Sequence, residues 1–143
     1  MVFRQGRVLA TASVVLTVAV AATGCGQSAD ERAREAFTSA VRDVGPHSHS
    51  IREYCREHIA MSTGDCLDVF ANAAAYCPWP DNHMPTILKS WAGNGGRTLR
   101  VRGRYRGGTS YTRDVVVVTY RGHLRLAYPY WLDSHSQPPC PAS

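Results

Sequence analysis

Apolar residues recur three or four positions apart in three stretches of the first half of the chain, the spacing that gathers them on one face of an α-helix. The predicted helices cover residues 29–44, 51–59 and 63–77. Ser28 and Glu31 have the S-x-x-E spacing of a capping box before the first helix, and Ser50 and Glu53 repeat it before the second. Gly45-Pro46 ends the first helix, because proline cannot continue it.

The second half of the chain favours strands. Residues 98–105, 110–120 and 123–131 are rich in Val, Tyr and Thr, and Gly107-Gly108 and Arg121-Gly122 between them are turn signals. Ahead of these strands, residues 85–91 are expected to form a short helix closed by Gly93. Helices followed by consecutive strands indicate an α+β domain, with N-terminal helices packed on a curved antiparallel β-meander.

The two turns predict how the strands pair. A two-residue turn at Arg121-Gly122 places Tyr120 opposite His123. A three-residue turn, residues 107–109, places Asp114 opposite Arg102 on the outer face, a favourable charge pair. A two-residue first turn would instead oppose Arg102 with Arg113.

This register also predicts the face that packs on the helices. It carries Leu99, Val101, Tyr105, Val115 and Val117. Arg113 points to the same side, near Gly103 and Tyr111. The missing side chain of Gly103 leaves room there for the stem of Arg113 or for a ligand. A candidate pocket is therefore lined by Tyr105, Tyr111, Arg113, Tyr128 and Tyr130, although plain core packing of these residues is the more frequent outcome.

The N-terminal 24 residues have the features of an export signal. Arg4 and Arg7 precede an uncharged apolar run, residues 8–22, which is short for a transmembrane helix. The run ends in Ala22-Thr23-Gly24-Cys25, which resembles the lipobox of bacterial lipoproteins. The resemblance implies cleavage before Cys25, a lipid such as palmitate on its thiol, and a location at the outer face of the cytoplasmic membrane. The alternative is an ordinary secretory signal cut near Ala22.

Cleavage at this site would divide the chain into four parts. Residues 1–24 are removed, residues 25–28 are the lipidated cysteine and a short tether, residues 29–133 form the domain, and residues 134–143 are a proline-rich tail. Three residues between Cys25 and the first helix span at most about 10 Å. The domain would therefore stay close to the lipid headgroups.

Four cysteines remain after Cys25, namely Cys55, Cys66, Cys77 and Cys140. An even number in an exported domain predicts two disulfides. Cys66 and Cys77 lie on one predicted helix, about 16 Å apart, which is too far for a bond. The favoured pairing is Cys55–Cys66 with Cys77–Cys140, and Cys55–Cys77 with Cys66–Cys140 stays open.

Charge is distributed unevenly. The whole chain has a formal net charge of +5, yet residues 30–81 hold nine acids and five arginines, whereas residues 97–125 hold eight arginines and one acid. Alternating arginines predict one basic strand face, with His123 at its edge: Arg100, Arg102, Arg104, Arg106 and Arg125. This arginine ladder is a candidate anion-binding surface for phospholipid headgroups or an anionic envelope polymer. A solvated strand face is the simpler interpretation. An extracytoplasmic location argues against nucleic acid as a partner.

No sequence motif assigns a catalytic residue or a cofactor. His47 and His49, with help from His58, His83 or His135, could bind a metal, but no carboxylate spacing supports such a site, so none is expected. If the protein were an enzyme, Asp114 and His123 would be the first pair to test.

The whole mature chain resembles small actinobacterial lipoproteins with a nuclear-transport-factor-2-like, or ketosteroid-isomerase-like, cone domain. The resemblance is carried by Cys25, the predicted first helix, the segment YCREHIAMSTGDC at residues 54–66 and the closing Tyr130-Trp131-Leu132-Asp133. It implies a disulfide between the second and third helices and a cone enclosing a pocket, although the family's sheet has more strands than the three predicted here.

We therefore expect a lipid-anchored, non-enzymatic accessory or binding module acting through an envelope protein, an anionic lipid or polymer, or a small ligand. A small-molecule enzyme of the ketosteroid-isomerase-like type is the alternative.

Overall fold

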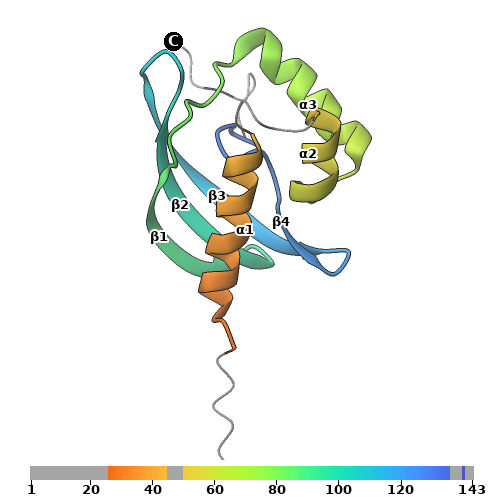
Figure 1. Cartoon of the computed structure of the whole chain (residues 1–143), viewed down its shortest axis with the longest axis vertical. Helices are drawn as coiled ribbons and strands as arrows, with labels where there is room; N and C mark the ends of the chain where they lie inside the picture. The colour runs from red at the N-terminus through yellow and green to blue at the C-terminus, as the bar shows by residue number, and fades with distance from the viewer. Residues whose placement is uncertain (1–25, 45–49, 136–139, 141–143) are drawn as a thin grey trace, which may run out of the picture.

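Three helices precede a four-stranded antiparallel sheet in the part of the chain that the computed structural model describes, residues 26–44, 50–135 and 140. The helices are α1 (Ala29–Asp43), α2 (Ile51–His58) and α3 (Thr63–Tyr76), and the strands are β1 (Thr86–Gly93), β2 (Gly96–Arg104), β3 (Ser110–Tyr120) and β4 (His123–Leu126). The sheet has the order β1-β2-β3-β4, so the expected α+β class is confirmed (Figure 1). None of the described helices has the length and apolar character needed to span a membrane.

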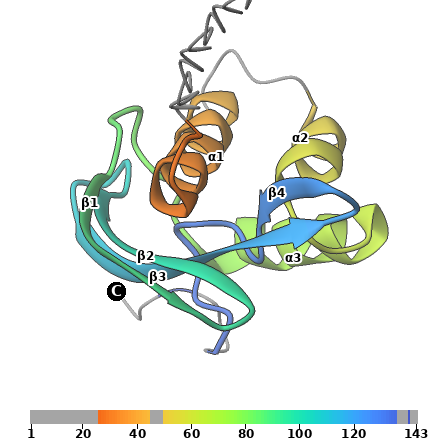
Figure 2. The ribbon, with the colours of Figure 1, turned by 90° about the horizontal axis from the view of Figure 1, so that it is seen from below.

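The sheet curves around α1, while α2 and α3 lie on the side of β4 (Figure 2). The core between these layers is aromatic. Phe37 of α1 meets Tyr130 edge to face, with 5.7 Å between the ring centroids. Phe70 of α3 meets Trp131 in the same manner at 5.6 Å. The segment after β4 therefore supplies side chains that join the helices to the sheet.

Local capping fixes the start of two helices. Ser28 Oγ accepts a hydrogen bond from the Glu31 amide at 3.1 Å, and Glu31 Oε2 accepts from the Ser28 amide at 2.7 Å, which confirms the first capping box. Ser62 Oγ caps α3 by accepting from the Asp65 amide. The capping box expected at Ser50 is wrong, because the Ser50 side chain makes no cap bond.

The short helix expected at residues 85–91 is a strand instead. Thr86–Gly93 is β1, which pairs along its length with β2. Asn94 and Gly95 form the turn, with φ values of 55° and 75°. Both central residues have left-handed backbone conformations, as in a type I′ turn. The twist of this turn matches that of paired antiparallel strands, so the residues on either side of it pair.

The strand register is confirmed at one turn and wrong at the other. Tyr120 pairs with His123 as expected. Asp114, however, lies opposite Arg100 and not Arg102. The first loop does contain three residues, but they are 106–108: the Tyr105 amide donates to the Thr109 carbonyl at 2.8 Å, and Gly108 takes the positive φ of 90°. Starting the loop one residue earlier moves every pairing partner by two positions and keeps the same faces.

The last predicted strand, residues 123–131, ends early at Leu126. The Ala127 amide still donates to the Val116 carbonyl at 2.8 Å, after which Pro129, which has no amide hydrogen, begins a turn closed by the Leu132 amide. The chain therefore leaves β3 at Val116, and β4 covers only residues 117–120 of that strand.

The disulfides follow the favoured pairing. Cys55–Cys66 joins α2 to α3 with a Cα–Cα distance of 5.8 Å, and Cys77–Cys140 joins the end of α3 to the C-terminal tail at 5.5 Å. The alternative pairing of Cys55 with Cys77 is thereby wrong. The second bond closes a loop of 63 residues and fixes the tail on the helical layer.

Asp30 fastens the first turn of α1 to the sheet. Its carboxylate accepts hydrogen bonds from Arg34 Nε at 2.6 Å, from Arg97 Nε at 3.1 Å and from the Ser90 hydroxyl. These donors, Ser90 and Arg34 first, lower the pKa of Asp30 from 3.8 to about 2. The contact joins α1 to β1 and β2, and the residues that it joins are 60 and 67 positions apart in the sequence.

Candidate functional site

The edge of β3 that β4 leaves uncovered borders a pocket. Residues 112–116 of β3 form one wall, and the segment that crosses from Ala127 to His135 forms the other. The cavity has a volume of about 360 Å³, within the range of small-molecule sites. Both polar and apolar side chains line it, so we call it the edge pocket.

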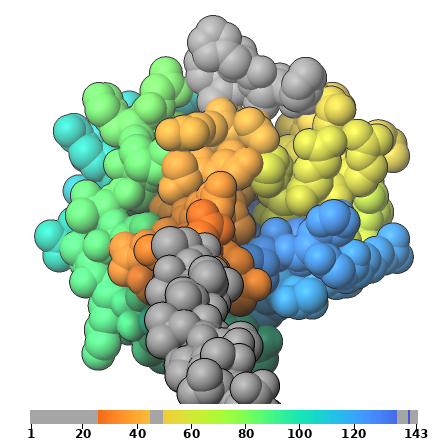
Figure 3. All heavy atoms as spheres, turned by 60° about the horizontal axis from the view of Figure 1, so that its bottom comes forward, coloured from red at the N-terminus to blue at the C-terminus, as the bar shows by residue number. Residues whose placement is uncertain are grey.

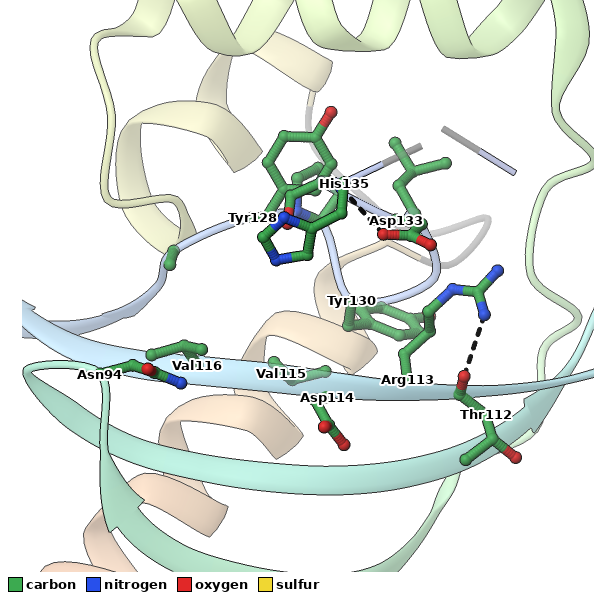
Figure 4. A pocket seen from close by; sticks show the side chains of 14 residues that line it. Asn94, Thr112, Arg113, Asp114, Val115, Val116, Tyr128, Tyr130, Asp133 and His135 are labelled. Atoms are coloured by element: carbon green, nitrogen blue, oxygen red, sulfur yellow. Dashed lines mark hydrogen bonds between the residues drawn. The ribbon is translucent and has the colours of Figure 1, made fainter. Parts of the chain in front are cut away.

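Arg113 supplies the positive charge of the edge pocket. It lies opposite Val101 in the sheet, and its Nη1 donates to the Thr112 carbonyl at 2.9 Å. Its Nε is buried and has no hydrogen-bond partner among the described residues. Figure 4 shows the Arg113 side chain on the side of β3 where Tyr130 and Asp133 lie, whereas Asp114 points to the other side.

The opposite wall adds an acid and a phenol. Asp133 Oδ1 accepts from the His135 amide at 2.9 Å, which fixes the carboxylate at the start of a turn. Burial and the nearby Asp133 raise the pKa of Tyr128, so its hydroxyl stays protonated and can donate. The lining of the edge pocket thus includes a residue with a guanidinium, one with a carboxylate and one with a phenol, a set suited to a polar ligand or a peptide segment.

The structure divides the five candidate pocket residues into two groups. Arg113, Tyr128 and Tyr130 line the edge pocket. Tyr105 and Tyr111 are buried, and their rings are tilted against each other with centroids 4.9 Å apart. Burial raises the pKa of Tyr105, and the charge and a hydrogen bond of Arg113 oppose that rise, so Arg113 also acts on this second group. Tyr111 covers Gly103, so the space that the sequence suggested for the stem of Arg113 is filled by an aromatic ring.

Tyrosines from the helices, the sheet and the segment after β4 are buried between the layers. Burial raises the pKa of Tyr54, Tyr111 and Tyr130, and the Tyr54 and Tyr111 hydroxyls have no partner among the described residues. Tyr105 donates to the Trp131 carbonyl at 3.1 Å. The curved face therefore carries a packed aromatic core at these positions.

Two members of the arginine ladder have partners in the structure. Arg100, Arg102 and Arg104 share the exposed face of β2, as expected, but Arg100 makes a two-pronged ion pair with Asp114 through Nε at 2.7 Å and Nη2 at 2.8 Å. That pair raises the pKa of Arg100 and lowers the pKa of Asp114. Arg106 stands in the loop after β2, and Arg125 lies over the ring of Tyr120 at 5.5 Å. One ladder cation is therefore neutralised and another is held by an aromatic ring.

The pair first suggested for catalysis is not brought together. Asp114 is held by Arg100, and His123 stands beside the β3–β4 turn, opposite Tyr120. Six residues of extended strand separate Asp114 from Tyr120, about 20 Å.

One described cluster has the atoms for a cation. Asp43, Glu57 and His58 each offer one ligand atom, and these atoms lie within 4.8 Å of one another. His58 Nε2 is 2.5 Å from Asp43 Oδ2, so the imidazole and the carboxylate already contact each other, which joins α1 to α2. Of the other histidines considered as ligands, His83 contacts Asp81 and His135 lines the edge pocket, while His47 and His49 lie outside the described residues.

Fold and site together define an α+β domain with an open antiparallel sheet, two disulfides and a ligand-sized pocket at a strand edge. Comparisons with protein families, with curated proteins and with solved structures find no match to this chain.

Proposed function

We propose that this protein is an extracytoplasmic lipoprotein that acts as a non-enzymatic binding module at the outer face of the cytoplasmic membrane, with the edge pocket as its recognition site. The observation that carries the proposal is the edge pocket itself, a cavity of about 360 Å³ whose lining includes the charged residues Arg113 and Asp133 and the phenol of Tyr128. A concave site of this size lined by both polar and apolar side chains is a common form of ligand site.

Two features support the anchored, exported state. The residues Ala22-Thr23-Gly24-Cys25 resemble a lipobox, and the capped α1 begins at Ala29, directly after the short tether. Both cysteine pairs are joined, which agrees with an oxidising compartment. The family resemblance adds the proposal that the sheet curving around α1 corresponds to the lipoprotein cone.

A binding role fits the site better than the alternative of a ketosteroid-isomerase-like enzyme. An enzyme of that kind needs a general base inside a closed cavity. Here aliphatic and tyrosine side chains fill the space between the sheet and the helices. The pKa values of Asp30 and Asp114 are lowered, by hydrogen bonds from Ser90 and Arg34 to Asp30 and from Arg100 to Asp114. Lowered carboxyl pKa values are typical of structural ion pairs.

Anchoring is tested by the variant Cys25→Ala in the native host. The proposal expects wild-type protein in the membrane fraction and the variant in the medium. A variant that stays in the membrane fraction would contradict lipid anchoring.

Recognition at the edge pocket is tested by a photo-crosslinking amino acid at Ser134, an exposed residue that lines the pocket. The matched control carries the same amino acid at Arg102, exposed on the outer face of β2. We expect a discrete adduct at position 134 that the further substitution Arg113→Gln removes. Equal adducts at both positions, or none at 134, would argue against a site there.

A further inference from the structure

A groove of about 470 Å³ lies at the end of the domain where α1 begins. Its walls come from the first turn of α1, the β1–β2 turn and the β3–β4 turn, represented by Ala29, Arg32, Ala92, Arg97, Gly122 and Leu124. Figure 3 shows this end, with the start of α1 between the green β1 side and the blue β3–β4 side. We call it the basal groove.

The walls of the basal groove are formed by small residues and two arginines, of which Arg97 is paired with Asp30 at 3.1 Å. Among its described lining residues the charged ones are Arg32 and Arg97, and most of the others are alanine or glycine. A Cβ on Gly96 would overlap the Val117 carbonyl oxygen, so bare backbone is required there. Arg97 is held in place because its Nε donates to Asp30 at 3.1 Å and to Ser90 Oγ at 2.8 Å, while its terminal nitrogens carry four further hydrogens that can donate.

A second cationic element stands beside the groove, at the tip of the β3–β4 hairpin. Arg121 is exposed and has a φ of 51°, a left-handed conformation that residues with a Cβ rarely adopt. Its guanidinium lies 5.3 Å from the ring centroid of Tyr120, and the guanidinium of Arg125 lies 5.5 Å from the same ring. Asparagine or glycine would suit this turn better, so the arginine places a positive charge at the tip at some cost in backbone strain.

The tether brings this end of the domain to the membrane. Gly26, Gln27 and Ser28 separate Cys25 from α1 and span at most about 10 Å. A domain attached through Cys25 therefore presents the basal groove and the Arg121 tip to the headgroups, where tyrosine and arginine are favourable side chains. Resting on the anchoring proposed above, we propose that the basal groove and the Arg121 tip dock the domain onto anionic phospholipid headgroups.

The arginine ladder lies away from the basal groove. Arg102 and Arg104 stand six and eight residues along β2 from Gly96, which is about 20 and 26 Å of extended strand away from the basal groove. At physiological ionic strength charge interactions decay over about 8 Å, so these cations contribute little to headgroup contact in the docked orientation.

Hydrogen exchange on the full chain reconstituted in vesicles tests the docking. Protein extracted from its own membrane is reconstituted through its own anchor in vesicles of phosphatidylglycerol or of phosphatidylcholine, and exchange is read at residues 92–97 and 119–124. Docking predicts slower exchange of both segments on phosphatidylglycerol alone, reversed in 1 M salt. Because the same anchored protein is used with both lipids, a difference between them does not depend on the nature of the anchor, and mass analysis of the Cys25 peptide reports separately whether Cys25 carries lipid.

Two matched variants locate the surface. Arg32→Ala with Arg121→Asn removes two basal charges, and Arg102→Ala with Arg104→Ala removes two ladder charges; all four arginines are exposed. We expect the basal pair to lower the docking equilibrium constant about thirtyfold and the ladder pair less than about twofold, from the usual contribution of one basic residue near an anionic surface. Equal exchange on both lipids, or an equal loss from both variants, would overturn the proposal.

Discussion

Replacing Asp30 with asparagine tests how α1 is fastened to the sheet. The Asp30 carboxylate accepts from Arg34 Nε, Arg97 Nε and the Ser90 hydroxyl, so the folded protein favours its ionised form. Its pKa falls from 3.8 to about 2 as a result. The substitution keeps the size of the side chain and removes the charge that these donors recognise.

The magnitude follows from that shift. A carboxyl pKa lowered from 3.8 to about 2 corresponds to about 2.4 kcal/mol of folding stability when the group is fully ionised. The Asp30 side chain is 30% exposed, and solvent screening reduces the expected contribution to about 1 kcal/mol. Because the folded state has the lower pKa, this stability is complete above about pH 5 and is lost as the pH falls through about 2.

Urea unfolding at pH 7 and at pH 2, with disulfides intact, measures the effect. We expect Asp30→Asn to lower the free energy of unfolding by about 1 kcal/mol at pH 7, about 4 °C in Tm, and by almost nothing at pH 2. Glu35→Gln, on the exposed face of the same helix, is the matched control and should change stability little at either pH. An equal loss at both pH values would mean that packing, and not the charge of Asp30, carries the effect.

Three further predictions concern stability. Gly103→Ala should cost about 2 kcal/mol in urea unfolding, because its Cβ would overlap a buried tyrosine hydroxyl, whereas Gly107→Ala, with open space around it, should cost much less. Removing the 63-residue disulfide loop with Cys77→Ser and Cys140→Ser should cost up to about 4 kcal/mol; an unchanged Tm would show that the bond is absent in solution. Arg121→Asn should raise stability by about 0.5–1 kcal/mol because asparagine tolerates its positive φ, and a loss would contradict the turn geometry.

Features with local causes could be predicted from the sequence. The capping box of Ser28 and Glu31 involves residues three apart, and Arg121-Gly122 determines its own turn. The favoured disulfide pairing could also be predicted. Cys66 and Cys77 lie too far apart along one predicted helix to form a bond, which excludes that pair. Asn94-Gly95 is an equally strong hairpin signal. A strand at residues 86–93 follows from that signal, whereas the apolar spacing of residues 85–91 favours a helix.

Features that depend on distant residues could not be predicted. Asp30 meets Ser90 and Arg97 across at least 60 positions, and no local pattern marks that contact. The edge pocket exists because β4 ends at Leu126 while β3 is longer, so its walls depend on where the chain leaves the sheet. The partner of Asp114 depended on a loop that starts one residue earlier than the glycines suggest.

Native mass spectrometry of the full-length protein, gently extracted from its own membrane, tests the proposed lipoprotein binding module most directly. The account predicts a chain that begins at Cys25, carries lipid on that residue and has two disulfides, together with a heavier species that retains a ligand or partner. A chain that begins elsewhere, or a Cys25 with a bare thiol, would contradict it.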